Sequence, residues 1–286
     1  MPEISGIKIA KKIIGRLKKQ PKTQKILAAI LIGKNPASLS FLSQKEKIAK
    51  ELRIDFKIYK FPSKITTKKL CQKIRKLAKF KKIGGIIVQL PLEKHLDIKQ
   101  ILNSIAAQKD IDVLGKGKEI GLLSPAVGTV KEILKYKKIK PSKTKIAIVG
   151  LGFLVGRPIA NWLKGKSECR KLYLLDKGKD FKILKNADIV ISGVGKAGLI
   201  KPRMLKNNAI VIDFGCSFQN GKIKPYLEIA SVSCFTSFFK ILKTFRFITL
   251  KGLKIAFINS GAYLKLRILS AKKTKGREKG ILNKKL

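Results

Sequence analysis

Short apolar runs recur along this chain and alternate with segments of helical spacing. The first half contains KILAAILIG (residues 25–33) and GGIIVQLPL (84–92), and the second contains KIAIV, KLYLLD, ADIVISGV and NAIVIDFG. A near-continuous apolar run suits a parallel strand that is buried on both faces of its sheet. Strands that alternate with helices need crossover connections, so the sequence predicts an α/β fold.

The order of these segments predicts two sheets. Helices are expected to about Gln20, over residues 38–52, 67–80 and 98–106, from about Ala126, and from the glycine-rich turn to about Lys164. A further strand is expected over residues 53–61, and a loop over 109–121. We place the boundary between Gly121 and Lys143. The predicted units are a catalytic domain (1–122), a small Rossmann-like domain (123–236) and a basic C-terminal segment (237–286) that is partly disordered.

Composition limits the class of protein. The chain has 286 residues, of which 45% are hydrophobic, so it is long enough to bury a substantial core. No run reaches the length of a membrane span, and the N-terminus lacks the uninterrupted apolar core of a signal peptide. We therefore expect a soluble, cytoplasmic protein that does not bind membranes.

The formal net charge is +48, from 65 Lys and Arg against 17 Asp and Glu. Such a charge attracts polyanions such as nucleic acid, anionic lipid or a polyglutamylated substrate. However, the lysines are spread along the whole chain, and aromatic residues, at 7%, do not interleave with them as a base-stacking platform requires. A lysine-biased composition without specific nucleic-acid binding is the favoured interpretation.

The cysteines and the single histidine do not form a recognisable centre. Cys71, Cys169, Cys216 and Cys234 lack metal-ligand spacing, and we expect no metal. His95 has no partner histidine, so a structural role is favoured over a catalytic one.

A glycine-rich turn, GLGFLVGRP, follows the KIAIV strand and precedes a helix. Glycines at Gly150, Gly152 and Gly156 allow a tight turn and the close approach of a phosphate to the helix N-terminus. The next strand ends at Asp176, whose carboxylate can accept hydrogen bonds from a ribose 2′-OH and repels a 2′-phosphate. This favours NAD over NADP, although Lys177 beside it can soften the repulsion.

In the first half, Lys45 follows Phe41 by one helical turn, so the two side chains share a face. A lysine in a partly desolvated site can have its pKa lowered enough to transfer protons near neutral pH. Gln89 lies at the carboxyl end of an apolar strand, where α/β sheets bind ligands, and Asp110 and Asp112 lie in the next loop. Taken singly, each has an ordinary alternative as a solvated lysine or a turn-capping aspartate.

The combination and order of these segments resemble the bifunctional methylenetetrahydrofolate dehydrogenase/cyclohydrolases. NPASLSFLSQKEKIAKEL resembles that family's NPAS…Y…K segment, and GGIIVQLPLEKH resembles its GxxVQLPLPxH signature. KDIDVL resembles the KDVDG loop, SPAVG a shortened PxTPxG, and GLGFLVGRP the GxSxxVGxP cofactor turn. VGKAGLI and AIVIDFG resemble VGxPxxI and AIVIDVG. The resemblance extends from about residue 5 to residue 224.

The resemblance implies a homodimer whose protomer has a catalytic α/β domain and a Rossmann domain separated by a cleft. It assigns Lys45 as the catalytic lysine, Gln89 as the glutamine that tunes it, and Asp112 as the aspartate that holds the pterin ring. Phe41, Leu90 and Pro91 would contact the folate. The cofactor residues implied by the match are Gly150, Gly152, Phe153, Gly156, Arg157, Pro158, Asp176, Val194 and Gly195.

The implied reactions are oxidation of 5,10-methylenetetrahydrofolate with NAD or NADP and hydration of the methenyl product to 10-formyltetrahydrofolate, a step of one-carbon metabolism linked to purine biosynthesis. Three departures from the family pattern bear on these implied reactions. Phe41 replaces a tyrosine, Val113 replaces a glycine, and no PVPGG loop follows residue 228. Either a frameshift replaced the C-terminus, or a divergent lineage re-purposed it. The alternative function is a catalytically impaired homologue whose basic surface binds polyanions.

Overall fold

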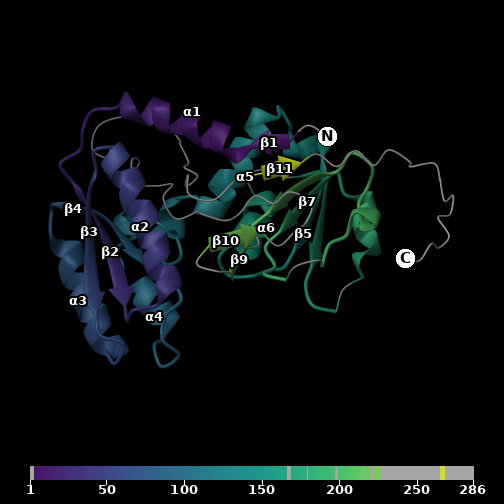
Figure 1. Ribbon diagram of the computed structural model, residues 1–286. Helices are drawn as coiled ribbons and strands as arrows, with labels where there is room; N and C mark the ends of the chain where they lie inside the picture. The colour runs from purple at the N-terminus through teal and green to yellow at the C-terminus, as the bar shows by residue number, and fades with distance from the viewer. Residues whose placement is uncertain are drawn as a thin grey trace, which may run out of the picture.

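The computed structural model describes residues 3–165, 169–178, 180–196, 199–214, 216–219, 222–225 and 265–267. These residues form two lobes, each built on a parallel sheet (Figure 1). The prediction of a two-domain α/β fold is confirmed. None of the helices in these ranges is long and apolar enough to cross a bilayer.

The first lobe contains a three-stranded parallel sheet of order β3-β2-β4. Its strands are β2 (Ile26–Ile32), β3 (Asp55–Phe61) and β4 (Ile83–Val88). Its helices are α2 (Pro36–Glu51), α3 (Thr67–Lys79) and α4 (Ile98–Asn103). β2 and β4 are buried along almost their whole length, as their continuous apolar runs predict.

The two faces of this sheet are covered by different helices. On one face, β2 and β4 contribute Ala28, Ile30, Ile86 and Val88 to a cluster with the apolar side of α3 and with α4. On the other, Ile87 belongs to the cluster that contains Ile48 and Ala49 of α2. Because side chains alternate along a strand, successive residues of β4 point toward α3 and α2 in turn. Figure 1 shows α2 and α3 on opposite sides of the strands.

The second lobe contains a four-stranded parallel sheet of order β6-β5-β7-β8. Its strands are β5 (Lys145–Val149), β6 (Lys171–Leu175), β7 (Ile189–Ser192) and β8 (Ile210–Asp213). Helix α6 (Gly156–Lys164) follows β5. The short 3-10 helices in the described ranges are η1 (Ala107–Lys109), η2 (Lys116–Ile120), η3 (Pro141–Lys143), η4 (Phe181–Asn186) and η5 (Pro202–Met204).

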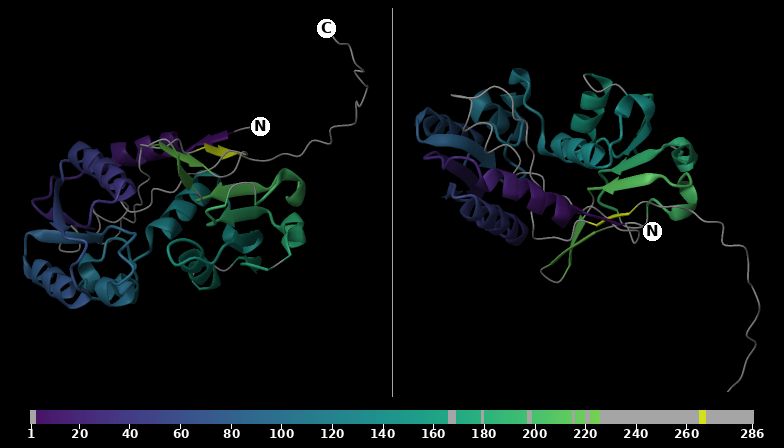
Figure 2. Two further views of the ribbon diagram at one scale, coloured as in Figure 1. Left: turned by 60° about the horizontal axis from the view of Figure 1, so that its bottom comes forward. Right: turned by 90° about the horizontal axis from the view of Figure 1, so that it is seen from above.

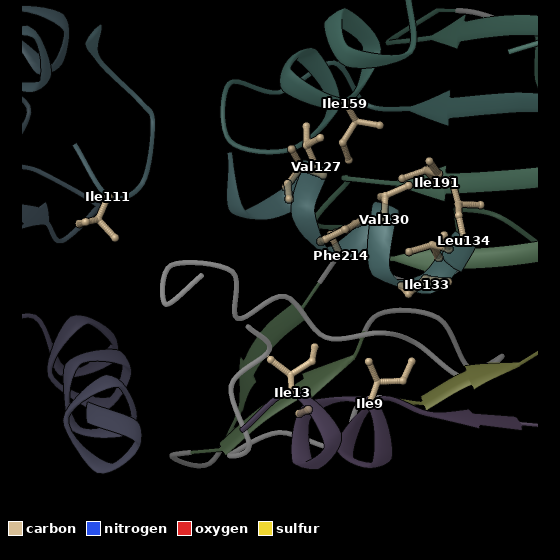
Figure 3. Packing of buried hydrophobic residues seen from close by; sticks show 14 of the residues in the cluster. Ile9, Ile13, Ile111, Val127, Val130, Ile133, Leu134, Ile159, Ile191 and Phe214 are labelled. Carbon is tan, nitrogen blue, oxygen red and sulfur yellow. The ribbon is translucent and has the colours of Figure 1, made fainter. Parts of the chain in front are cut away.

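Helices α1 (Gly6–Lys18) and α5 (Pro125–Tyr136) connect the lobes through a shared core. One apolar cluster includes Ile9 and Ile13 of α1, Ile48 of α2, Val130 of α5 and Ile146 of β5. Figure 3 shows Ile9 and Ile13 pointing from α1 toward α5. Two ion pairs, Arg16–Glu132 at 3.5 Å and Lys18–Glu51 at 2.8 Å, attach α1 to α5 and to α2. These pairs are partly exposed, so the apolar core supplies most of the stabilisation.

Strands near both ends of the chain meet beside the second lobe. β1 (Glu3–Ser5) pairs antiparallel with β11 (Lys265–Arg267), and β9 (Cys216–Gln219) pairs with β10 (Lys222–Pro225). Figure 2 shows α1 extending from β1 along both lobes. The predicted disordered tail lies outside the described residues, apart from the three residues of β11, which form a strand.

Two element boundaries differ from the predictions. The strand expected from Arg53 begins at Asp55, because Arg53 has a φ of 56° and closes the end of α2. The helix expected to reach Ala106 ends at Asn103, where Ser104 donates its hydroxyl to the carbonyl oxygen of Ile101. Side chains of this type compete with helical hydrogen bonds, which accounts for the shorter helix.

The shared core predicts a large effect of truncating Ile13, which is only 1% exposed. Ile13→Ala is expected to lower the free energy of unfolding by about 2–5 kcal/mol, because it removes buried methyl groups and leaves a cavity. The measurement is urea denaturation followed by circular dichroism. Ile98→Ala is the matched control, because Ile98 is 42% exposed. Equal effects of the two substitutions would contradict the shared core.

Candidate active site

Helix α2 places a lysine inside the protein. Asn35 caps its N-terminus by accepting a hydrogen bond from the Ser38 backbone N–H at 3.0 Å, and Pro36 is its first residue. Ser38, Phe41 and Lys45 are spaced by three and four residues and therefore share one side of the helix. Lys45 is 4% exposed, which is rare for a lysine unless it is hydrogen-bonded.

Gln89 meets this lysine from the carboxyl end of β4. Ile87 faces α2, so Gln89, two residues further, projects to the same side of the sheet. Lys45 Nζ donates a hydrogen bond to Gln89 Oε1 at 3.0 Å, and both groups are buried. Gln89 Nε2 donates to the carbonyl oxygen of Leu90 at 2.6 Å, which fixes the amide with its oxygen toward the lysine.

Asp112 comes to the site from a segment that lies beside β4. The Ile111 backbone N–H donates to the Ile86 carbonyl oxygen at 3.4 Å, and Asp110 forms a parallel bridge with Ile86. This approach depends on Gly85, because a Cβ there would lie 2.5 Å from the Ile111 side chain. Lys45, Gln89 and Asp112 are all less than one-tenth exposed. The structure therefore brings together the three residues that the sequence singled out as catalytic.

Asp110, which the sequence placed beside Asp112 near the ligand-binding end of the sheet, has a structural role. Its Oδ2 accepts hydrogen bonds from the backbone N–H groups of Gly115 and Gly117, at 2.9 and 3.0 Å. These contacts fold the loop that follows Asp112. Asp110 thus caps a turn, the ordinary alternative for a loop aspartate.

The electrostatics of the site act on Lys45 in two directions. Burial lowers the pKa of Lys45 from its ordinary value of 10.5, because desolvation disfavours the ammonium form. The negative charge of Asp112 opposes this effect and favours the ammonium. Desolvation is the larger of the two effects, so the pKa of Lys45 is lowered on balance, and Gln89 is a neutral acceptor that adds no charge.

The glycine-rich turn of the second lobe lies between β5 and α6. Gly150 has a φ of 84°, and a Cβ at Gly156 would lie 1.9 Å from the Gly150 carbonyl oxygen. Only glycine fits at these positions, so the turn packs closely enough for α6 to begin at Gly156. In contrast, a Cβ at Gly152 would meet no atom within 4 Å. Space is therefore left where a phosphate could approach the backbone.

The remaining predicted cofactor residues lie around this turn and at the ends of neighbouring strands. Gly150 donates its N–H to the carbonyl oxygen of Leu175, which sets the turn next to Asp176 at the end of β6. Asp176 is exposed, and its Oδ1 accepts from the Lys177 N–H at 3.0 Å. Val194 and Gly195 follow β7, and the Val194 side chain would touch a Cβ at Gly150. Phe153 and Arg157 are exposed and Pro158 is partly buried.

Other predicted residues have simpler surroundings. Phe41 and Leu90 are partly buried, and Pro91 is exposed. His95 Nε2 lies 3.0 Å from the Ile65 carbonyl oxygen, which joins two loops and fits a structural role. Among the described residues, no group of three or more His, Cys, Asp or Glu side chains gathers as metal ligands.

Ser38 is a buried polar residue that sequence reasoning did not single out. It lies on the same side of α2 as Lys45, is 1% exposed, and its hydroxyl oxygen has no hydrogen-bond partner in the described part of the chain. A buried hydroxyl without a partner is costly unless a ligand or water satisfies it. The sequence feature that could have drawn attention to Ser38 is its place in the NPAS segment, directly after Pro36 and Ala37 at the start of the helix.

Comparison with known proteins identifies the family. The tetrahydrofolate dehydrogenase/cyclohydrolase catalytic-domain model matches residues 4–112, and the corresponding NAD(P)-binding-domain model matches residues 124–239. The chain belongs to the tetrahydrofolate dehydrogenase/cyclohydrolase family. The resemblance inferred from the sequence motifs is thus confirmed.

Relatives of known name support this assignment. The bifunctional protein FolD of Chlamydia pneumoniae is 37% identical over 227 residues, which cover 74% of this chain and 79% of that protein. FolD of Aquifex aeolicus is 33% identical over 235 residues, covering 77% and 81%. The crystal structure of the bifunctional FolD dehydrogenase/cyclohydrolase of Campylobacter jejuni has a TM-score of 0.73 at 29% identity, covering 78% of this chain and 85% of that one.

Membership of the tetrahydrofolate dehydrogenase/cyclohydrolase family makes the chain an enzyme of one-carbon metabolism, and the second lobe is its NAD(P)-binding domain. The three buried polar residues lie in the catalytic-domain match, and the glycine-rich turn lies in the NAD(P)-binding match. The two halves of the predicted site therefore fall in the two matched units.

The opposing effects on Lys45 predict opposite pKa shifts in two isosteric variants. Asp112→Asn removes the charge that favours the ammonium, so the pKa of Lys45 should fall further. Gln89→Glu places a carboxylate at the acceptor position 3.0 Å from Nζ, so the pKa should rise. The measurement is a 13C NMR titration of lysine-labelled protein, with the resonance assigned by its absence in Lys45→Met. Shifts of the same sign in both variants would refute the arrangement.

Proposed function

We propose that Lys45, Gln89 and Asp112 form one centre that serves both reactions of the family in this chain. The observation that carries the proposal is the buried hydrogen bond from Lys45 Nζ to Gln89 Oε1, beside the charge of Asp112. Burial lowers the pKa of Lys45, which makes its amine more readily available as a proton acceptor than that of a solvated lysine.

In the first reaction, the methylene carbon of 5,10-methylenetetrahydrofolate loses a hydride and the cationic methenyl species forms. NAD or NADP supplies the hydride acceptor. In the second, water adds to the methenyl carbon and loses a proton, and the bond from that carbon to N5 breaks to give 10-formyltetrahydrofolate. The atoms balance with one water consumed and one proton released.

The roles of the three residues follow from their chemistry. Neutral Lys45 accepts the proton from the attacking water, which is why its lowered pKa matters. Gln89 keeps the amine directed toward the reacting carbon. Asp112 provides the carboxylate that holds the pterin ring by its N–H groups, as the family match suggests. Phe41, Leu90 and Pro91 are proposed to pack against the folate, and without a hydroxyl Phe41 contributes packing alone.

The glycine-rich turn suits a dinucleotide. Its close packing at Gly150 and Gly156 and its open space at Gly152 fit a pyrophosphate on the backbone N–H groups at the start of α6. Phe153, Arg157, Pro158, Val194 and Gly195 surround it. The exposed carboxylate of Asp176 at the end of β6 supports NAD over NADP, because it would repel a 2′-phosphate.

The cellular setting is also a proposal. We infer a cytoplasmic homodimer that supplies 10-formyltetrahydrofolate to purine biosynthesis, with the folate held between domains 1–122 and 123–236. The support is the family assignment and the location of the proposed folate and dinucleotide residues in different matched units.

The first experiment measures both reactions. Purified protein is given 5,10-methylenetetrahydrofolate with NAD and with NADP in turn, and reduced cofactor and methenyl product are followed by absorbance. We expect turnover with both absorbance signals. Folded protein without turnover would instead support the catalytically impaired alternative.

Lys45→Met should lower the rate of hydration of the methenyl species by a factor of about 100 to 10,000, because the proton acceptor is removed. Dinucleotide binding, measured by fluorescence titration, should be unchanged. Lys47→Met is the matched control, because Lys47 lies on the exposed side of the same helix. Normal hydration by Lys45→Met would exclude the lysine from the mechanism.

Asp176→Ser should shift the ratio of kcat/KM for NAD over NADP toward NADP, by roughly tenfold, because an exposed charged hydrogen bond is lost and a repulsion is removed. The readout is initial rates with each cofactor. Asp180→Ser is the control: it removes the same charge nearby, and serine can still cap the helix that Asp180 caps. An unchanged ratio for Asp176→Ser would refute the preference for NAD.

A further inference from the structure

Helix α3 presents an exposed surface that is basic along its entire length. Its apolar residues face the sheet, and every exposed side chain except Gln72 is a lysine or an arginine. We call these residues the α3 basic face: Lys68, Lys69, Lys73, Arg75, Lys76 and Lys79. The six lie within a single stretch of sequence, residues 68–79, and the packing of the apolar side of α3 leaves all of them on the exposed side.

The charges of the α3 basic face are not balanced by acids. The ion pairs in the described part of the chain join Arg16 to Glu132, Lys18 to Glu51 and Lys206 to Asp188, so none involves α3. The first turn of α3 has no acidic residue, although an acid there would complement the helix dipole. The carboxylate of Asp97, near this end, is engaged in capping α4.

Two further lysines extend the basic region at the other end of α3. Lys109 Nζ donates to the carbonyl oxygens of Ala78 and Phe80, and Lys25 Nζ donates to that of Lys81. These bonds anchor the ammonium groups at the helix C-terminus. Lys81 and Lys82, which follow, are exposed. The basic surface is thus held by a helix and its fixed end rather than by a loose loop.

The α3 basic face is separate from the proposed active site. α3 packs on one face of the β3-β2-β4 sheet, whereas Lys45 lies on α2 against the other face. Figure 1 shows α3 at the outer margin of the first lobe. A large ligand on α3 would therefore leave the folate and dinucleotide residues accessible.

The chemistry of this surface selects among polyanions. A membrane-bound helix inserts an apolar face between lipids, but the apolar residues of α3 are covered by the sheet. Single-stranded nucleic acid is held by stacking successive bases on several aromatic residues. α3 contains none, and the exposed Phe80 at its C-cap is a single ring. The α3 basic face offers closely spaced cations along the length of a helix, and this suits the closely spaced phosphates of a duplex.

We propose that the α3 basic face binds the phosphate backbone of double-stranded nucleic acid, without sequence preference. Its exposed side chains are almost all cations, which pair with backbone phosphates whatever the base sequence. Binding is then electrostatic and weakens steeply with salt. This property is independent of the proposed folate chemistry.

The test is fluorescence anisotropy of labelled RNA and DNA duplexes of mixed sequence, titrated with the whole protein at several salt concentrations. The first variant carries Lys69→Gln, Lys73→Gln and Lys76→Gln. The control variant carries Lys131→Gln, Lys135→Gln and Lys140→Gln, which are exposed lysines on or after α5 and remove the same charge. Dehydrogenase and hydration rates of both variants serve as a check on folding.

We expect the α3 variant to bind less tightly and to show a salt slope smaller by roughly 2 to 3, because three phosphate contacts are lost. The control should stay close to the wild type, and the folate rates of both should be unchanged. Equal losses in the two variants would overturn the proposal in favour of diffuse attraction by net charge. Absence of binding by the wild type, or equally tight binding to phosphatidylserine vesicles, would also overturn it.

Discussion

The buried side-chain amine of Lys45 is the feature on which the proposed site depends. A lysine in an apolar setting is costly, and the surrounding structure compensates through Gln89 Oε1 at 3.0 Å and through the charge of Asp112. These partners come from α2, β4 and the segment after η1, which are distant in sequence. The parallel sheet brings them to its carboxyl edge, so the same constraint that forms the fold also sets the pKa of the lysine.

The shared core explains how two sheets can serve one reaction. The first lobe carries the proposed proton-transfer residues and the second carries the glycine-rich turn, so the proposed function requires a steady separation between them. α1 and α5 contribute to a single cluster that includes residues of both sheets, such as Ile87 and Ile146. The two lobes are thereby joined mainly by apolar packing rather than by surface ion pairs.

Much of this could be predicted from the sequence, for a physical reason. Strands buried on both faces have apolar runs that are easy to recognise, and Gly150 and Gly156 mark a turn that only glycine can form. What the sequence could not provide was the contacts that individual residues make. The resemblance already separated Asp112 from Asp110, but only the loop geometry shows that Asp110 holds two backbone N–H groups. The basic character of the helix over residues 67–80 can be read from the sequence, but only the packing of α3 on the sheet shows which side of it stays exposed.

Val113 shows what a family pattern can add to such reasoning. It replaces a glycine of the resembling KDVDG loop, and the sequence alone made this a minor change. In the structure Val113 has a φ of 54°, a left-handed conformation that is unfavourable for a β-branched side chain by roughly 1–2 kcal/mol. The glycine of the family pattern therefore has a conformational reason. Val113 is 8% exposed, so burial of its side chain offsets part of this strain. The loop that carries Asp112 thus buries a conformationally strained valine at the position where the resembling pattern has glycine.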